Sequence, residues 1–390
     1  MAGVENVEGG GVAVRIRAAV LDEMGRPRPY TDSRPLRIAE VELDPPGPGE
    51  VLIEVRAAGV CHSDLSVVDG NRPRPLPMVL GHEAAAVVRE PGPGVDDLAP
   101  GDHVVVVFVP ACGTCPACAE GRPALCARAA EANTAGTLLS GARRLHENGR
   151  PLHHMVGCSV FAEYAVVSRR SLVPVDPDLP FPHAALFGCA VLTGVGAVLN
   201  TAGVRPGQTV AVVGLGGVGL NALLGAVLAG ARRLVAVDPV AEKRALAREL
   251  GATLTVDPRE ADAVARVRAH TDGGVDAAIE AVGSVPALEF AWEITRRGGV
   301  TVSAGLAHPD HRLSLPPVRL VGEERTLRGS YMGSCVPVRD IPRYVELFRR
   351  GRLPVDRLVA ECLPLEEINT ALERLAAGTT LRQIVLPHGA

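Results

Sequence analysis

The sequence predicts an α/β protein in which an irregular β-rich domain is joined to a doubly wound parallel sheet. Strand-like and helix-like segments alternate over residues 191–333, and such alternation is typical of a parallel sheet with crossover helices. Short β-branched runs interrupted by proline and glycine occupy residues 15–109, which indicates irregular β structure. A chain of 390 residues is also longer than one hydrophobic core usually organises, so we expect two domains.

The elements of the second domain can be placed in order along the chain. Strands are predicted at TVAVVG, RRLVAVD, TLTVD, VDAAIEAVG and VTVSAGL, and helices at GVGLNALLGAVLAGA and AEKRALARELG. After residue 334 the pattern is mixed again and includes the helical stretches IPRYVELFRRG and LEEINTALERLAAG. We therefore predict a flexible lead-in over residues 1–14, a first domain over 15–190 that residues 334–390 rejoin, and a second domain over 191–333.

The composition limits the classes of partner and the compartment. Hydrophobic residues make up 47% and charged residues 22%, and the formal charge of −4 excludes a strongly basic nucleic-acid-binding surface. No segment reaches the roughly 18 consecutive apolar residues of a membrane span, and the N-terminal stretch lacks the apolar core of a signal peptide. We therefore expect a cytoplasmic protein with neither a nucleic-acid nor a membrane partner. In that reducing compartment the nine cysteines are better explained as metal ligands than as disulfides.

A glycine-rich turn follows the first strand of the second domain. Residues 214–219 read GLGGVG and satisfy the pattern G-x-G-x-x-G at the start of a predicted helix. Such glycines allow a tight turn and a close approach of the backbone to a pyrophosphate, which the helix N-terminus then binds; here they are Gly214, Gly216, Gly217 and Gly219. Asp238 ends the next strand, where an acid accepts hydrogen bonds from the adenosine ribose and repels a 2′-phosphate. The pattern predicts a Rossmann domain that binds NAD; the alternative is a glycine turn that only packs a helix onto a sheet.

Lys243 is the only lysine of the chain and follows Asp238 by five residues. Because the sequence uses arginine everywhere else, we predict that this lysine contacts the cofactor. The alternative is a chance lysine on a solvated helix.

Four cysteines lie within one short loop, PACGTCPACAEGRPALC. Cys112, Cys115, Cys118 and Cys126 are spaced C-x2-C-x2-C-x7-C, with prolines and glycines between them that supply turns. Four thiolates enclose a tetrahedral zinc ion completely and leave no open position, which is typical of a structural site. The alternative is a chance cluster or a redox pair.

A second set of zinc ligands is dispersed along the sequence. Cys61, His82 and Cys189 together offer two thiolates and an imidazole, which form a three-ligand site with a vacant position of the kind that a catalytic zinc needs. Spacing alone does not select these residues. Taken singly, a buried cysteine is more often a small core residue, and a lone histidine is more often structural.

The motifs GVCHSD, GHEAA, the four-cysteine loop, GCAVLTG and GLGGVG occur in an order that resembles the zinc-containing medium-chain alcohol dehydrogenases, in their longer, liver-type branch. The resemblance runs from about Arg15 to the C-terminus. It implies a GroES-like catalytic domain, two zinc ions per subunit, NAD, and a homodimer that pairs sheet edges. It also implies reversible oxidation of a small-molecule alcohol to an aldehyde or ketone, with hydride transfer to NAD. Under this resemblance Cys61, His82 and Cys189 are the catalytic zinc ligands.

The resemblance also assigns roles to single positions. Ser63 would hydrogen-bond the substrate oxygen and begin a proton relay, Asp64 would orient the ligating histidine, and Glu83 would lie near the metal. The other matched positions are cofactor contacts and parts of the substrate channel: His62 and Arg382 at the pyrophosphate, Thr193 and Val218 beside the nicotinamide, and Phe108, Met155 and Val156 in the channel. One position departs from the pattern. Ser66 stands where many liver-type members carry a histidine that ends the relay, so water or another residue would complete the route.

Two other functions remain open. A thiol-dependent formaldehyde dehydrogenase, of mycothiol or glutathione type, would share the fold and both zinc sites. The glutathione-using members bind the adduct with an arginine, but here Arg128 lies two positions before the matching place and Ala130 occupies it. The alternative of another class is a non-catalytic NAD-binding zinc protein, which the intact catalytic ligand set disfavours. The remaining cysteines, Cys158, Cys335 and Cys362, are predicted to be core residues.

Overall fold

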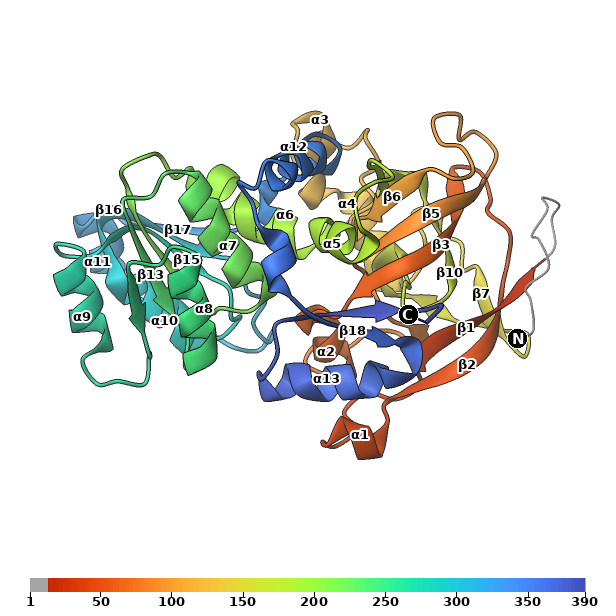
Figure 1. The fold of residues 1–390 in the computed structure, drawn as a ribbon, viewed down its shortest axis with the longest axis horizontal. Helices are drawn as coiled ribbons and strands as arrows, with labels where there is room; N and C mark the ends of the chain where they lie inside the picture. The colour runs from red at the N-terminus through yellow and green to blue at the C-terminus, as the bar shows by residue number, and fades with distance from the viewer. Residues whose placement is uncertain (1–12, 390) are drawn as a thin grey trace.

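The computed structural model describes residues 13–389, and its strands form three sheets in two lobes (Figure 1). The predicted lead-in, residues 1–14, lies outside the described residues except for its last two, and strand β1 (Val14–Leu21) begins there. Within residues 13–389 no single helix is long and apolar enough to cross a membrane. A pair bent by 52°, Phe181–Gly188 with Ala190–Ala202, reaches the length only jointly, and most of its residues are buried in the core.

Two sheets form the β-rich lobe. The first has the strand order β8-β7-β2-β1-β4-β9, with β2 (Leu36–Leu43), β4 (Met78–Val79), β7 (Leu145–Glu147), β8 (Arg150–Pro151) and β9 (His153–His154). The second has the order β11-β6-β5-β3-β19-β18, with β3 (Glu50–Gly59), β5 (Ala84–Pro91), β6 (His103–Val106), β11 (Leu172–Pro174), β18 (Val359–Pro364) and β19 (Arg382–Leu386), and β10 (Tyr164–Ser168) pairs with β3.

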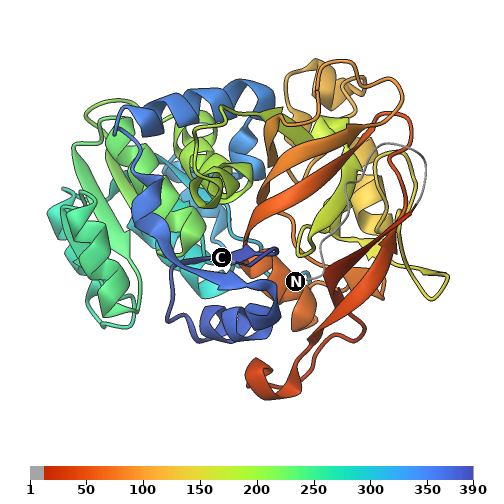
Figure 2. The ribbon, with the colours of Figure 1, turned by 45° about the vertical axis from the view of Figure 1, so that its right-hand side comes forward.

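The C-terminal segment returns to the β-rich lobe, where it is drawn in blue (Figures 1 and 2). Strand β19 pairs antiparallel with β3, so that Ile384 lies opposite Gly59. Helix α13 (Ile368–Ala377) connects β18 to β19, and α12 (Pro337–Arg349) precedes them. The last strand therefore brings the end of the chain against the strand that precedes the first cysteine motif.

The other lobe is built on a parallel sheet with the order β14-β13-β12-β15-β16-β17. Its strands are β12 (Thr209–Val213), β13 (Arg233–Val237), β14 (Leu254–Val256), β15 (Val275–Glu280), β16 (Thr295–Ser303) and β17 (Thr326–Gly329), and its helices are α7 (Gly217–Leu228), α8 (Ala241–Glu249), α9 (Ala263–His270), α10 (Val285–Ile294) and α11 (Pro317–Gly322). The strand order reverses between β12 and β15, and ligands of such sheets bind in the crevice at the carboxyl ends of the strands there.

Both faces of this sheet are covered by helices. Alternate residues of a strand point to opposite faces: Val212 of β12 joins the core cluster that contains Leu223 of α7, whereas Ala211 joins the cluster that contains Ile294 of α10. The central strand β12 is accordingly buried along its whole length, whereas β16 carries the exposed Arg296 and Arg297 near its start. The predicted fold class is confirmed.

The cysteines outside the two zinc sets are placed differently from one another. Cys158 and Cys335 are fully buried, as predicted, but Cys362 is exposed, so the prediction that it belongs to the core is wrong. In β18 its neighbour Leu363 points inward, and a strand turns the adjacent side chain to the opposite face.

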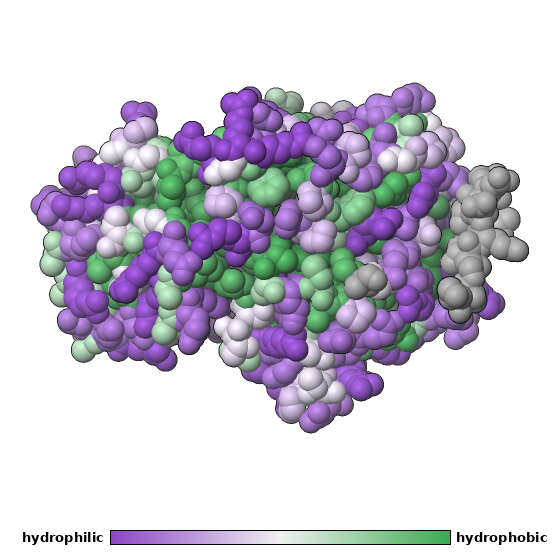
Figure 3. Space-filling model, viewed as in Figure 1, coloured by the Kyte–Doolittle hydropathy of each residue, from purple (hydrophilic) through white to green (hydrophobic). Residues whose placement is uncertain are grey.

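Over the face seen in Figure 3, hydrophilic side chains cover most of the raised surface.

Candidate active site

Cys61 directly precedes helix α2 (His62–Val68), and Asp64 lies in the first turn of this helix. One oxygen of the buried Asp64 carboxylate accepts a hydrogen bond from the backbone N–H of Cys61 at 3.0 Å. The other lies 3.0 Å from Nδ1 of His82. Asp64 therefore holds two predicted zinc ligands in a fixed relation, and it directs the remaining nitrogen of the imidazole toward Cys189.

The three predicted catalytic zinc ligands meet in the interior. Ligand atoms of Cys61, His82, Glu83 and Cys189 all lie within 4.8 Å of one another, and all four residues are buried. Nε2 of His82 is 3.6 Å from Sγ of Cys189, which directly precedes helix α6 (Ala190–Gly196). Residues that are up to 128 positions apart in sequence are thus brought to one point by α2, the approach to β5 and the start of α6.

The chemistry of this donor set fits a divalent cation. A hydrogen bond from the Cys189 thiol, together with the nearby His82, holds the pKa of Cys61 well below its usual value. The same hydrogen bond and burial raise the pKa of Cys189 well above its usual value. Two thiolates side by side in the interior require a positive charge, and zinc, which prefers sulfur and nitrogen ligands, supplies it.

Glu83 is tied to the cofactor side of the site by Arg382. The two side chains form an ion pair in which Glu83 is fully buried and Arg382 is 4% exposed. Arg382 packs directly against Gly217 in the glycine-rich turn, where any side chain would collide with it. A single arginine therefore joins the carboxylate beside the predicted zinc ligands to the predicted pyrophosphate site.

The glycine-rich turn has the backbone that its sequence predicts. Gly214 has a φ of +92°, and a side chain at Gly219 would collide with the Gly214 carbonyl oxygen, so both positions require glycine. The Asp238 carboxylate, 6% exposed, accepts hydrogen bonds from the backbone N–H groups of Leu215 and Val240, each at 2.8 Å. Lys243 lies partly exposed in the first turn of α8. Asp238 therefore also fixes the turn itself.

One cavity connects the predicted metal ligands to the crevice of the parallel sheet. All three predicted ligands line it, and so do eight other residues expected at the site: His62, Ser63, Ser66, Phe108, Met155, Val156, Thr193 and Val218. The ring of Phe108 stands edge-on between the rings of His82 and Tyr331, with centroid distances of 5.7 and 5.8 Å. The other lining residues were not predicted, and Arg72, Arg74, Leu306 and Tyr331 are among them.

Comparison with known proteins identifies the family. Residues 47–177 match the model of the alcohol dehydrogenase GroES-like domain, and residues 217–350 match that of the zinc-binding dehydrogenases. A Mycobacterium tuberculosis protein assigned by name as alcohol dehydrogenase D is 40% identical over 377 residues, which are 96% of this chain and 100% of that protein. The chain is a zinc-dependent medium-chain alcohol dehydrogenase.

Other members of the family differ in their substrates. An Escherichia coli S-(hydroxymethyl)glutathione dehydrogenase is 38% identical over 91% of this chain and 97% of its own length. The crystal structure of benzyl alcohol dehydrogenase from Acinetobacter calcoaceticus superposes with a TM-score of 0.89 at 33% identity, covering 96% and 99% of the two chains. A Sinorhizobium meliloti structure with bound NADP has a TM-score of 0.77 at 28% identity, covering 96% and 100%. A nicotinamide cofactor is therefore shared, whereas the substrate varies.

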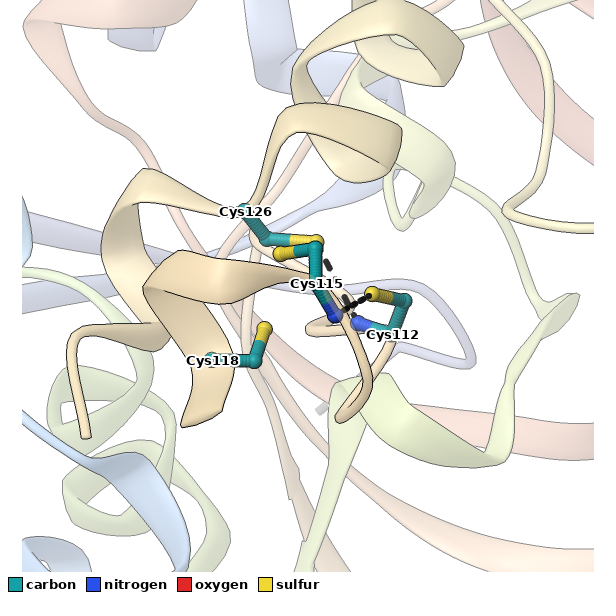
Figure 4. A group of neighbouring side chains, drawn as sticks. All are labelled: Cys112, Cys115, Cys118 and Cys126. Atoms are coloured by element: carbon teal, nitrogen blue, oxygen red, sulfur yellow. Dashed lines mark hydrogen bonds between the residues drawn. The ribbon is translucent and has the colours of Figure 1, made fainter. Parts of the chain in front are cut away.

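The four-cysteine loop of this dehydrogenase forms a separate cluster. Cys112, Cys115, Cys118 and Cys126 have sulfur atoms within 4.8 Å of one another, and Figure 4 shows the four side chains pointing toward a common centre. Hydrogen bonds from the backbone N–H groups of Thr114 and Cys115 lower the pKa of Cys112 to about 6. Burial raises the pKa of Cys118 to about 12.

Arg128, the residue weighed as a ligand for a thiol adduct, lines a cavity beside this loop and not the cavity at Cys61.

Proposed function

We propose that this dehydrogenase oxidises an alcohol reversibly to an aldehyde or ketone and transfers the hydride to NAD. In this proposal the catalytic zinc domain comprises residues 15–190 and 334–390, and the NAD-binding domain comprises residues 191–333. The observation that carries the proposal is the convergence of Cys61, His82 and Cys189 in a cavity that opens onto the switch point of the parallel sheet. A metal site with three protein ligands keeps a position for substrate, as catalysis requires.

The bound groups supply the redox chemistry. Zinc acts as a Lewis acid that lowers the pKa of a hydroxyl group, as it lowers that of water from about 15.7 to about 7, and NAD accepts the hydride. The chain positions the alcohol and removes its proton. Ser63 lines the cavity directly after Cys61, so its hydroxyl group would accept the proton and pass it outward.

The outer end of this proton route differs from the family pattern. The Ser66 hydroxyl donates a hydrogen bond to the backbone carbonyl of His62 at 2.9 Å, one helical turn earlier. Its proton is therefore directed toward its own helix and not toward Ser63. We propose that water completes the route between Ser63 and solvent.

The remaining cavity residues exclude water and align the substrate. Phe108, Met155 and Val156 contribute apolar side chains to the cavity, and Thr193 and Val218, the positions proposed beside the nicotinamide, line it too. A water-poor site of this kind strengthens the electrostatic interactions on which proton removal and hydride transfer depend.

The proposal of NAD in place of NADP depends on Asp238. Its buried carboxylate follows β13, at the carboxyl edge of the sheet where the adenosine ribose of a dinucleotide would lie. A negative charge there accepts hydrogen bonds from two ribose hydroxyls and repels a 2′-phosphate. Lys243, in the next helix, would approach the same part of the cofactor.

Two zinc ions per subunit are proposed, one catalytic and one structural. A cytoplasmic location is proposed with them, because a reducing compartment keeps thiols available as metal ligands. Metal analysis tests the stoichiometry: the wild type should hold two zinc ions per subunit, and Cys115→Ser should hold one. A wild type that binds one ion would contradict the proposal.

A homodimer is proposed through the free edge of the parallel sheet. Strand β17 ends the sheet, and the exposed Leu327, Val318 and Val321 lie on it and on the neighbouring α11. An edge strand beside exposed apolar side chains is suited to pairing with a second sheet edge. Analytical ultracentrifugation should give twice the subunit mass, and Leu327→Glu should shift the equilibrium to monomer.

A substrate panel tests the proposed reaction. Primary, secondary and aromatic alcohols should each be assayed for NADH formation, with a parallel series that contains formaldehyde together with glutathione or mycothiol. We expect NADH from at least one alcohol without a thiol. NADH only in the series with formaldehyde and thiol would establish the thiol-dependent alternative, which the absence of an arginine at Ala130 disfavours. Zinc without any turnover would establish the non-catalytic alternative.

A further inference from the structure

Two arginines face the substrate cavity from the loop between α2 and β4. Arg72 and Arg74 alternate with prolines in the segment RPRP, and both are half-buried. Both line the cavity that contains Cys61 and Cys189. Pro73 and Pro75 restrict the backbone of this segment, so the two arginines enter the cavity wall from a stiff loop.

Neither arginine has an acidic partner within the described part of the chain. Arg74 donates one hydrogen bond, to the backbone carbonyl of Asn133 at 3.4 Å, and no carboxylate lies within 4.0 Å of either guanidinium group. The described lining of the cavity contains no aspartate or glutamate. By contrast, Arg37 on the surface pairs with both Asp22 and Glu147. The two guanidinium groups therefore line the cavity without a carboxylate to balance their charge.

The two positive charges disfavour one another. Burial lowers the pKa of Arg72, and the neighbouring charge of Arg74 lowers it further. Two like charges at the wall of a partly desolvated cavity are unfavourable unless an anion lies between them. Guanidinium groups bind carboxylate and phosphate oxygens through paired, charge-assisted hydrogen bonds, so such an anion would satisfy both residues.

The position of the pair fits the far end of a substrate. Phe108 packs edge-on against the rings of His82 and Tyr331, and Tyr331 lines the same cavity as the two arginines and the predicted metal ligands. Arg74 and Tyr331 also line an adjoining cavity that continues past Val156, and that lining too contains no acidic residue. A substrate with its hydroxyl group at the metal site would extend along Phe108 toward the two arginines.

We propose that the substrate of this dehydrogenase is an alcohol or aldehyde whose far end carries an anionic group, carboxylate or phosphate, bound by Arg72 and Arg74. The inference rests on the proposed alcohol oxidation and names its substrate class. Neutral alcohols of the same shape would fill the apolar part of the cavity but leave both guanidinium groups without an anionic partner.

Matched substrates test the inference. The zinc-loaded enzyme should be assayed with 4-(hydroxymethyl)benzoate, 4-(hydroxymethyl)phenyl phosphate and the neutral 4-methylbenzyl alcohol. We expect kcat/KM for at least one anionic substrate to exceed that for the neutral alcohol by about tenfold or more, the value of one charge-assisted hydrogen bond. Which anion is preferred distinguishes carboxylate from phosphate. Higher ionic strength should reduce the preference.

Variants separate recognition from other roles. Arg72→Gln and Arg74→Gln should each raise KM for the preferred anion about tenfold or more, and the preference over the neutral alcohol should fall by the same factor. Arg205→Gln, on an exposed loop outside the cavity, is the matched control and should change neither substrate. An equal loss for both substrates, or a raised KM for NAD with the preference unchanged, would overturn the inference.

Binding in the absence of turnover distinguishes this inference from the proposed reaction. Calorimetric titration of 4-(hydroxymethyl)benzoate and of the phosphate into zinc-loaded protein should show binding of one of them that is weakened by Arg74→Gln. Such binding without NADH formation would support the anion site and contradict the proposed reaction. Alcohol turnover without any preference for anions would support the reaction and contradict the anion site.

Discussion

Replacement of Arg382 by methionine would leave a carboxylate without a counter-charge in the interior. Glu83 is fully buried, and Arg382 is its ion-pair partner. The other oxygen of Glu83 has no hydrogen-bond partner among the described residues. Burial already raises the pKa of Glu83, and the positive charge of Arg382 opposes this rise. In the variant the unfavourable free energy of burying the Glu83 carboxylate is no longer offset by an ion pair, so the folded state is less stable.

The size of the effect follows from the burial of both groups. Loss of one partner of a buried ion pair destabilises a protein by about 3–5 kcal/mol. The entropy of unfolding is about 2.1 cal/mol/K per residue, or about 0.8 kcal/mol/K for a chain of 390 residues. Arg382→Met should therefore lower Tm by about 4–6 °C, if the chain unfolds as one unit.

Scanning calorimetry of a double-mutant cycle tests this reasoning. Arg382→Met and Glu83→Gln should each lower Tm, and the double variant should be more stable than the sum of the two losses predicts, because neither buried charge then remains. Zinc content should be measured for every protein, and Arg205→Gln provides the control. Single losses below 1 °C, or strictly additive losses, would refute the account of this pair.

Three further predictions concern protonation and specificity. Burial lowers the pKa of His154 to about 3, so its imidazole stays neutral in the folded protein. The imidazole of the unfolded chain binds a proton below about pH 6.5, so the free energy of unfolding falls below that pH, by about 1.4 kcal/mol at pH 5.5. His154→Gln, which retains an acceptor for the backbone N–H of Arg144, should flatten the fall of Tm between pH 7 and 5, and parallel curves would contradict this. Asp238→Ser should lower kcat/KM for NAD by about 10- to 100-fold and that for NADP by less, since it removes charge-assisted hydrogen bonds to the ribose; equal losses would show that Asp238 only supports the turn. Ser66→His should speed alcohol oxidation and shift its pH profile to lower pH, and an unchanged profile would show that a side chain at position 66 does not lie at the outer end of the proton route.

Local patterns made much of the fold predictable. The glycine-rich turn and the four-cysteine loop are formed by neighbouring residues, so spacing and context were enough to predict their geometry. The central strand β12 is a short, fully buried run, because helices cover both faces of the sheet there. The inward and outward alternation of the edge strand β18 was missed, and Cys362 was therefore wrongly predicted to be buried.

The catalytic zinc ligands could not be predicted from residue spacing alone. Cys61, His82 and Cys189 are brought together only by the tertiary fold, and the family resemblance selected them. The role of Arg382 as the partner of Glu83 was not predicted, because the two residues meet through the pairing of β19 with β3. Arg72 and Arg74 belong to no motif, and only the structure shows that both face the cavity.

The central claim is that zinc held by Cys61, His82 and Cys189 supports oxidation of an alcohol by NAD. The most direct measurement is alcohol-dependent NADH formation by the wild type and by Cys61→Ser, with zinc counted in both proteins. The account predicts NADH and two zinc ions per subunit for the wild type, and one zinc ion without activity for the variant. Undiminished activity in a Cys61→Ser protein that has lost one zinc ion would contradict it.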